Sequence, residues 1–300
     1  MWDQLIHDIK DGDTRALARS ISLVENEAKG FEKFLQSLPS RKGGKVIGIT
    51  GSPGAGKSTL VDALLDHYTK ENKKTAVCCI DPSSPFHHGA LLGDRIRMSK
   101  WYNHPAVFIR SLASRGSLGG LHPHIIEITD ILQAADFDQV IIETVGVGQS
   151  EIEITGLADI TLLVLVPEGG DEIQTMKAGI MEIADIFVVN KSDRPGADAF
   201  VANLQLMLMP SHYEDRNAPI LKTVAATGEG IEPLARSIDE QLQHSNENKI
   251  SWLLTERAWQ LIRNKRMQNI DKELVHQQLQ AASKQPGFNL YSFVDHIDKT

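Results

Sequence analysis

Residues 51–58 read Gly-Ser-Pro-Gly-Ala-Gly-Lys-Ser and match the pattern G-x-x-x-x-G-K-[ST]. The pattern follows an apolar run at 46–49, which we expect to be a strand, and precedes a helical stretch at 59–68. The glycines let consecutive backbone N–H groups face a phosphate at a helix start, where the helix dipole favours an anion. Lys57 then reaches the β- and γ-phosphate oxygens, and the Ser58 hydroxyl is placed to bind Mg²⁺. The segment predicts a nucleoside triphosphate site built from Gly51, Ser52, Pro53, Gly54, Ala55, Gly56, Lys57, Ser58 and Thr59.

A second pattern, Asn190-Lys191-Ser192-Asp193, follows the apolar run 186–189 and indicates which base is bound. The Asp193 carboxylate can accept from both N1–H and the 2-amino group of guanine, whereas adenine offers neither donor on that edge. We expect Asn190 to brace the loop and Lys191 to cover the base. After the next expected strand, Ala225 and Ala226 are placed to give a backbone N–H to guanine O6. The two patterns together favour GTP over ATP.

Three acidic residues are candidates to complete a Mg²⁺ site with Ser58. Glu143 ends the apolar run 139–142, at the place of the acidic metal ligand in phosphate-loop enzymes. Asp81 ends the run 75–80 and opens a turn, and Asp94 lies in the loop that follows. For each of the three, the alternative is a helix cap or a solvated turn carboxylate.

The elements that must position these residues alternate along the chain. Helical periodicity over residues 1–40 gives way to short apolar runs separated by helical stretches, which predicts an α/β fold with a mainly parallel sheet flanked by helices. Together with the phosphate-binding pattern, these elements predict the P-loop NTPase fold. We expect an N-terminal helical arm at 1–40, a nucleotide-binding domain at 41–245 and a C-terminal helical extension at 246–300. The expected strands are 46–49, 75–80, 106–109, 139–142, 160–166, 186–189 and 220–224.

Composition narrows the class of protein further. The 300 residues carry a formal net charge of −8, which argues against nucleic acid as the main partner. The longest apolar run, 160–166, is too short to cross a bilayer, and the first residues do not resemble a signal peptide. Cys78 and Cys79 are neighbours that would point to opposite faces of a strand, so a disulfide is excluded and both are expected in the core. These features predict a cytoplasmic protein without a membrane or nucleic-acid partner.

Taken together, the motifs make the chain resemble the MeaB/ArgK family, the SIMIBI-class GTPases that serve as accessory proteins of methylmalonyl-CoA mutase and related cobalamin-dependent mutases. The likeness covers nearly the whole chain. Besides residues 51–58 it rests on Asp81-Pro82-Ser83-Ser84-Pro85, on Leu92-Gly93-Asp94-Arg95, on Ser114-Arg115-Gly116, on Glu143-Thr144-Val145-Gly146-Val147-Gly148-Gln149-Ser150-Glu151, and on Gly170-Asp171-Glu172-Ile173-Gln174.

This resemblance implies a GTP-driven chaperone that gates cofactor transfer to a cobalamin-dependent mutase, with an adenosyltransferase as a further partner, and that works as a homodimer through its helical extensions. Two alternatives stay open. A nickel metallochaperone would use His87 and His88, although paired histidines without a nearby thiol are more often a solvated loop. A small-molecule kinase is disfavoured by the guanine pattern.

Hydrolysis by such a site is an in-line attack of water on the γ-phosphate, with Lys57, Glu143 and Mg²⁺ at the phosphates. Gly146 would give its N–H to the γ-phosphate and so sense its loss. Ras-like GTPases place a water-orienting glutamine directly after the equivalent glycine, but here that residue is Val147, so slow intrinsic turnover is expected. Gln149 is one candidate substitute. Lys177 is another, its alternative being a solvated helix lysine.

Overall fold

The computed structural model describes two compact units, residues 1–253 and residues 254–300. The described residues are 1–39, 44–81, 98–114, 121–146, 153–168, 184–208, 218–243, 247–267, 270, 272–285 and 287–297. The candidate site lies entirely in the first unit.

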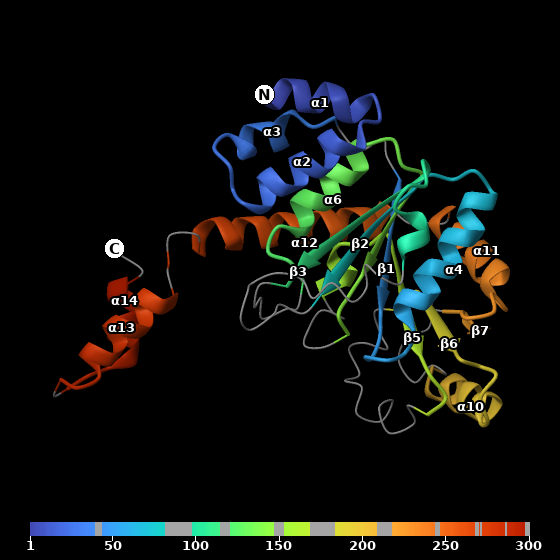
Figure 1. The fold of residues 1–300 in the computed structure, drawn as a ribbon. Coiled ribbons are helices and arrows are strands. Elements are labelled where there is room, and N and C mark those ends of the chain that lie inside the picture. Colours follow the sequence, from blue (N-terminus) through green and yellow to red (C-terminus); the bar gives the residue numbers. More distant parts are fainter. Residues whose placement is uncertain are drawn as a thin grey trace. The chain divides into compact units, whose positions relative to one another are not determined.

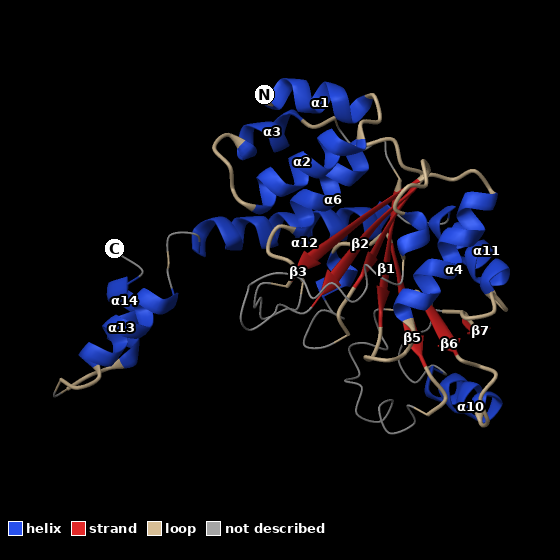
Figure 2. Cartoon of the chain, viewed as in Figure 1, coloured by secondary structure: helices blue, strands red, loops and turns tan. Residues whose placement is uncertain are grey.

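A seven-stranded sheet forms the centre of the first unit (Figures 1 and 2). Its order is β3-β2-β4-β1-β5-β6-β7, and every neighbouring pair is parallel. Helices cover both faces, which explains why the central strands read as continuous apolar runs. The expected fold class is confirmed. The strands are β1 (Lys45–Thr50), β2 (Thr75–Asp81), β3 (Val107–Ala113), β4 (Gln139–Glu143), β5 (Ile160–Leu165), β6 (Ile186–Asn190) and β7 (Ile220–Thr223).

One face of the sheet packs against α4 (Lys57–Lys70) and α11 (Ile231–Gln243). In β1 the side chains of Ile47 and Ile49 lie in one hydrophobic cluster with Leu60 of α4 and Leu234 of α11. Residues at odd positions in β1 therefore point toward α4, because successive side chains of a strand alternate between faces.

The opposite face packs against α6 (Ile125–Ala134) and the N-terminal helices α1 (Trp2–Lys10), α2 (Thr14–Glu25) and α3 (Phe31–Ser37) (Figure 1). Val46 of β1 belongs to this second cluster, together with Ile128 of α6 and Leu17 of α2. The short helix η2 (Ile154–Gly156) lies on the same side: a Cβ built at Gly48 would stand 2.6 Å from Cγ1 of Ile154. Even positions in β1 face these helices.

Polar contacts stabilise α2 and connect it to the sheet. Asp13 caps the start of α2 by accepting hydrogen bonds from the N–H groups of Arg15 and Ala16. Arg110 in β3 donates from Nη2 to the Ser22 hydroxyl at 3.0 Å and to the Glu25 carboxylate at 2.9 Å. The N-terminal helices thus share a core with the sheet and belong to the first unit.

Toward the β7 edge of the sheet, β5 and β6 pack against α10 (Ala197–Leu208) through a third cluster, which includes Leu163, Phe187 and Phe200.

The short helix η1 (Ser99–Trp101) leads into β3, and the Trp101 indole N–H donates to Asp62 of α4 at 2.7 Å. The helix α12 (Glu247–Met267) begins in the first unit, and its Leu253 is buried.

The second unit holds the rest of α12, α13 (Lys272–Ala282) and α14 (Leu290–Ile297). The apolar residues near the C-terminus lie in a helix, since residues 290–297 form α14. Within the described residues, no helix combines the length and the apolar character needed to cross a membrane. Large side chains are exposed on these helices, among them Trp259, Ile262, Met267, Leu274 and Tyr291.

Candidate functional site

A pocket of about 370 Å³ opens where β1, β2 and β4 end and α4 begins. The carboxyl end of a parallel sheet is where ligands bind in open α/β folds, and this volume lies within the range of small-molecule sites. Most of the predicted phosphate and metal residues meet here. The lining residues are Pro53, Gly54, Gly56, Lys57, Ser58, Thr59, Ile80, Asp81, Glu143, Thr144, Val145 and Lys191.

The phosphate loop runs from Gly51 to Gly56 and passes directly into α4. Gly56, with φ +90°, is the residue before the helix, and a Cβ built there would stand 2.4 Å from Nδ2 of Asn190. A residue with a side chain at position 56 would therefore be strained by the left-handed backbone conformation, and its Cβ would clash with Asn190. Gly56 therefore reflects close packing between the phosphate loop and Asn190 at the end of β6.

Lys57 is buried, and its Nζ donates to the carbonyl oxygens of Gly51 at 2.7 Å and of Ser52 at 3.1 Å. These bonds hold the ammonium group at the centre of the phosphate loop. Gly146, with φ +83°, lies against the same group: a Cβ built there would stand 2.3 Å from the Gly51 carbonyl oxygen and 2.5 Å from Lys57 Nζ. The structure thus brings Gly146 next to the phosphate loop.

Glu143, at the end of β4, faces the start of α4. Its Oε1 accepts a 2.7 Å hydrogen bond from the Ser58 hydroxyl, and its Oε2 lies 3.8 Å from Cys79 Sγ, a weak donor. The register explains the grouping, because Glu143 pairs with Ile49 of β1 and with Cys79 of β2, so the three side chains share the face toward α4. Asp81 is also buried and lines the same pocket.

The two cysteines point to opposite faces of the sheet, as predicted. Cys79 belongs to the cluster under α4 and Cys78 to the cluster under α6, and both are free thiols. Burial raises the pKa of Cys78 to about 12. Cys79 was expected only as a core residue, and its contact with Glu143 was not predicted. The strand order, which one sequence does not reveal, is what brings the two together.

Asn190 connects three segments of the site. Its Nδ2 donates to the Ala55 carbonyl oxygen of the phosphate loop at 2.9 Å. Its Oδ1 accepts from the Ala225 N–H at 3.1 Å and from the Thr223 hydroxyl at 3.2 Å. The side chain is buried, so each of these polar groups depends on the others for its hydrogen bond. The Asn190 amide therefore ties the phosphate loop to the loop after β7.

Of the residues that follow Asn190, Lys191 lines the pocket. Lys191, with φ +56°, donates from Nζ to the Gly54 carbonyl oxygen at 2.7 Å. Asp193 is exposed and is not among the residues that line the pocket. Of the two predicted donors to guanine O6, Ala225 already gives its N–H to Asn190, while Ala226 follows it in an exposed turn.

Several predicted residues lie outside the described part of the chain. They are Asp94 of the metal set, Gln149 and Lys177 of the hydrolytic set, and the pair His87 and His88. Three further residues that line the pocket, Ile80, Thr144 and Val145, were given no role in the site from the sequence. Each lies within two residues of a predicted acid, so closeness to Asp81 or Glu143 was the available signal. Among the described residues, no group of three or more His, Cys, Asp or Glu side chains is arranged to hold a metal.

A parallel sheet, a glycine-rich loop leading into a helix, and a buried lysine and serine at that helix start define a P-loop nucleotide-binding protein. Comparison with known proteins agrees. The family model for methylmalonyl-CoA mutase-associated GTPase MeaB matches residues 17–284, so the chain belongs to this family of GTPases.

Individual relatives and solved structures are similar to this chain over most of its length. A Pyrococcus abyssi protein named as a GTPase is 48% identical over 245 residues, which are 80% of this chain and 76% of that protein. The fused isobutyryl-CoA mutase of Geobacillus kaustophilus is 38% identical over 233 residues, 73% of this chain but 21% of the fused protein. Among solved structures, a LAO/AO transport system kinase superposes with a TM-score of 0.66 at 25% identity and covers 99% of this chain and 96% of its own. HypB from Helicobacter pylori in complex with nickel, at 19% identity, TM-score 0.51 and coverage of 74% and 94%, shares the fold.

Proposed function

We propose that this protein binds GTP with Mg²⁺, hydrolyses it, and uses the change between its GTP and GDP states to control cofactor loading of a cobalamin-dependent acyl-CoA mutase. The observation that carries the proposal is the arrangement around Asn190, which bonds the phosphate loop at Ala55 and the loop after β7 at Ala225. A guanine-reading segment and a phosphate-binding segment are thereby held as one site. Membership in a GTPase family supports this assignment.

Phosphate binding is assigned to backbone groups and one cation. The backbone N–H groups of the phosphate loop and of the first residues of α4 within 51–59, apart from Pro53, which has none, would hold the phosphates, with Lys57 between the β- and γ-phosphates. Because these donors belong to the backbone and to one buried lysine, they do not need a basic surface. This agrees with the formal net charge of −8.

Guanine recognition is assigned to the segment after β6. The exposed Asp193 carboxylate would accept from N1–H and the 2-amino group, and Lys191 would cover the base. Since the Ala225 N–H is bonded to Asn190, the donor to guanine O6 is assigned to Ala226.

The donor set at the end of β4 fits Mg²⁺. A serine hydroxyl and a carboxylate lie 2.7 Å apart, and a second carboxylate, Asp81, lines the same pocket. Mg²⁺ prefers such hard oxygen ligands and takes one or two carboxylates beside phosphates and waters, which suits a site whose described residues include no group of three or more His, Cys, Asp or Glu side chains arranged to hold a metal. Ser58, Glu143 and Asp81, with Asp94 as a further candidate, would hold the ion, which when bound neutralises charge on the β- and γ-phosphates.

For hydrolysis, the residues assigned are Lys57, which neutralises charge on the γ-phosphate, and Gly146, whose N–H would reach that phosphate. Gln149 and Lys177 are the candidates to orient water or to supply a further positive group. The residue after Gly146 is Val147, so we expect slow turnover by the isolated protein and faster turnover with its partner.

The mutase partner is supported by a relative in which the homologous region is fused to isobutyryl-CoA mutase. Fusion keeps the GTPase-like region and the mutase together in one chain, so a GTPase and a mutase that exist as separate chains are expected to associate. We further propose an adenosyltransferase as a second partner and a homodimer formed through the C-terminal helices, whose exposed Trp259, Ile262 and Leu274 offer apolar contact area.

The test measures nucleotide hydrolysis and association together. Purified protein is incubated with GTP or ATP and Mg²⁺, and phosphate release is followed; a mutase pull-down is then run with a non-hydrolysable GTP analogue. We expect release from GTP, little from ATP, and capture of a cobalamin-dependent mutase that Lys57→Ala abolishes. Equal release from ATP would refute the guanine assignment. Failure to capture the mutase in both nucleotide states would refute the partner.

A further inference from the structure

Two buried threonines meet at the point where the phosphate loop and the Gly146 segment leave the sheet. Thr50 is the last residue of β1, directly before Gly51, and Thr144 directly follows the last residue of β4. Their hydroxyl oxygens lie 2.9 Å apart, so one donates a hydrogen bond to the other. Both side chains are almost fully buried, at 1% and 2% exposure, so water does not compete for this bond.

This pair lies on the far face of the sheet from α4. Thr50 occupies an even position of β1, like Val46 and Gly48, and these positions face α6, η2 and the N-terminal helices. Glu143 occupies the other face, beside Ser58. Thr50 is also absent from the residues that line the pocket, so its hydroxyl does not contact a ligand there; it acts through Thr144, which does line the pocket.

Three contacts in sequence hold the Gly146 segment against the phosphate loop. The Thr144 N–H donates to the Ile49 carbonyl oxygen at 3.0 Å and continues the β1–β4 ladder by one bond. The hydroxyl pair then fixes the Thr144 side chain to Thr50. Two residues later Gly146 lies against Gly51, with no room for a Cβ. The hydroxyl pair is the one side-chain bond in this series, since the other two contacts involve backbone.

We propose that Thr50 is a positioning residue whose hydroxyl pair with Thr144 holds Gly146 where it recognises the γ-phosphate, and that it thereby sets the preference of the site for GTP over GDP. This inference rests on the proposed function. GDP lacks the phosphate that Gly146 would contact, so loosening the segment weakens GTP binding and leaves GDP binding unchanged.

The test is competition of GDP and of a non-hydrolysable GTP analogue against a fluorescent guanine nucleotide, which measures binding without turnover. Thr50→Val keeps the shape and removes the hydroxyl. We expect the ratio of GTP-analogue to GDP affinity to fall about three- to tenfold, the range that one neutral hydrogen bond supplies. Thr50→Ser retains the hydroxyl and should keep the ratio within about twofold of the wild type.

A matched control is Thr75→Val in β2. Thr75 is also fully buried, but its hydroxyl has no hydrogen-bond partner among the described residues and lies at the start of its strand, away from the pocket. The Thr75→Val variant should leave the ratio of GTP-analogue to GDP affinity unchanged. If Thr50→Val alters the ratio no more than Thr75→Val does, the inference is wrong.

The double variant Thr50→Val with Thr144→Val covers the case in which a single variant folds poorly. Each single change leaves one buried hydroxyl without its partner, whereas the double change removes both, so thermal stability should recover while the affinity ratio stays low. A double variant with the wild-type ratio would overturn the inference. If the wild type binds neither nucleotide, or if Lys57→Ala binds both as the wild type does, the proposed function itself fails.

Discussion

Replacing Gly146 by alanine tests how tightly the segment after β4 is docked on the phosphate loop. The new Cβ would stand 2.3 Å from the Gly51 carbonyl oxygen and 2.5 Å from Lys57 Nζ. Gly12, in the turn between α1 and α2, has the same φ of +83°, but a Cβ there would meet nothing within 4 Å. The two positions therefore share a backbone conformation and differ in the space around it.

The expected magnitudes follow from this difference. A left-handed conformation costs a residue with a Cβ about 1–2 kcal/mol, and this applies to both variants. Overpacking against fixed atoms adds about 1–3 kcal/mol at Gly146 only, because the nearest atom that the new Cβ meets, the Gly51 carbonyl oxygen, belongs to the backbone. Gly146→Ala should lower the free energy of unfolding by about 2–5 kcal/mol and Gly12→Ala by about 1–2 kcal/mol.

The assay is urea unfolding followed by far-ultraviolet circular dichroism, with the denaturant slopes of both variants compared with that of the wild type. A hydrogen-exchange measurement on residues 143–146 separates local from global loss, because an undocked segment exchanges faster even if the sheet remains intact. Equal destabilisation by the two alanines, with unchanged exchange at 143–146, would refute the close docking of Gly146.

Three further predictions concern single side chains. Asp193→Asn should reduce the preference for GTP over ATP by roughly 10- to 100-fold in a competition assay, the value of one or two hydrogen bonds to a charged group; unchanged selectivity would contradict the base assignment. Cys78, whose pKa burial raises to about 12, should resist alkylation at pH 8 in the folded protein and react after unfolding, as mass spectrometry would reveal. His124 lies between Glu127 and Glu27, and hydrogen bonds to these carboxylates raise the pKa of His124. The stability that His124 adds over His124→Gln should therefore be full below about pH 6.5 and decline as pH rises through the higher pKa of the folded state. Denaturation of both proteins at pH 6 and pH 8.5 measures this difference in stability, and the same difference at both pH values would exclude the ion pairs.

The fold was largely predictable because its signals are local. Each buried strand appears as an apolar run, and the phosphate-binding pattern and the guanine pattern each follow a strand. The third strand was predicted to end at Ile109, but β3 continues to Ala113. Arg110 interrupts the apolar run, yet it stays in the strand because Ser22 and Glu25 of α2 accept its hydrogen bonds. A single sequence does not show that a distant helix will satisfy a charged strand residue.

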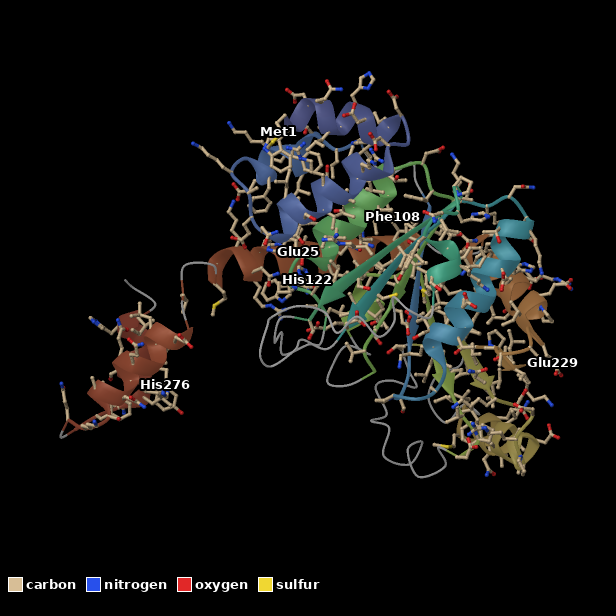
Figure 3. All side chains as sticks on the ribbon, in the orientation of Figure 1. Met1, Glu25, Phe108, His122, Glu229 and His276 are labelled. Atoms are coloured by element: carbon tan, nitrogen blue, oxygen red, sulfur yellow. The ribbon has the colours of Figure 1, made fainter. Side chains whose placement is uncertain are left out.

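A second polar contact of the same kind lies between the N-terminal helices and the segment before α6. His122 is fully buried, and its Nε2 lies 3.8 Å from Oε1 of Glu25 at the end of α2 (Figure 3). Its Nδ1 accepts from the His124 N–H at 3.1 Å, which places the ring proton of the neutral form on Nε2, toward Glu25. The spacing of these residues in the sequence, nearly one hundred positions apart, gave no sign of the contact.

In the candidate site, the residues predicted best were those within continuous motifs. Lys57, Ser58 and Glu143 meet in one pocket because a helix start and a strand end bring them there. The contacts of Cys79 and Thr50 were missed because they depend on which strands are neighbours and in what register. Register is set by packing over the whole sheet and has no signature in a short window.

The alternation of side chains along β4 also limits how this protein can change by insertion or deletion. Glu143 faces α4 and Thr144 faces the opposite side of the sheet. They point to different faces only because they are consecutive residues, and successive side chains along a strand alternate between faces. Loss of one residue from the strand would place a carboxylate under the apolar cover of α6 and a hydroxyl beneath the phosphate loop. Neighbouring side chains can repack around a point substitution in the core. The loss of one strand residue, in contrast, moves every following side chain of the strand to the other face of the sheet. Chain-length variation is therefore expected in the loops around this sheet and not within β1 or β4.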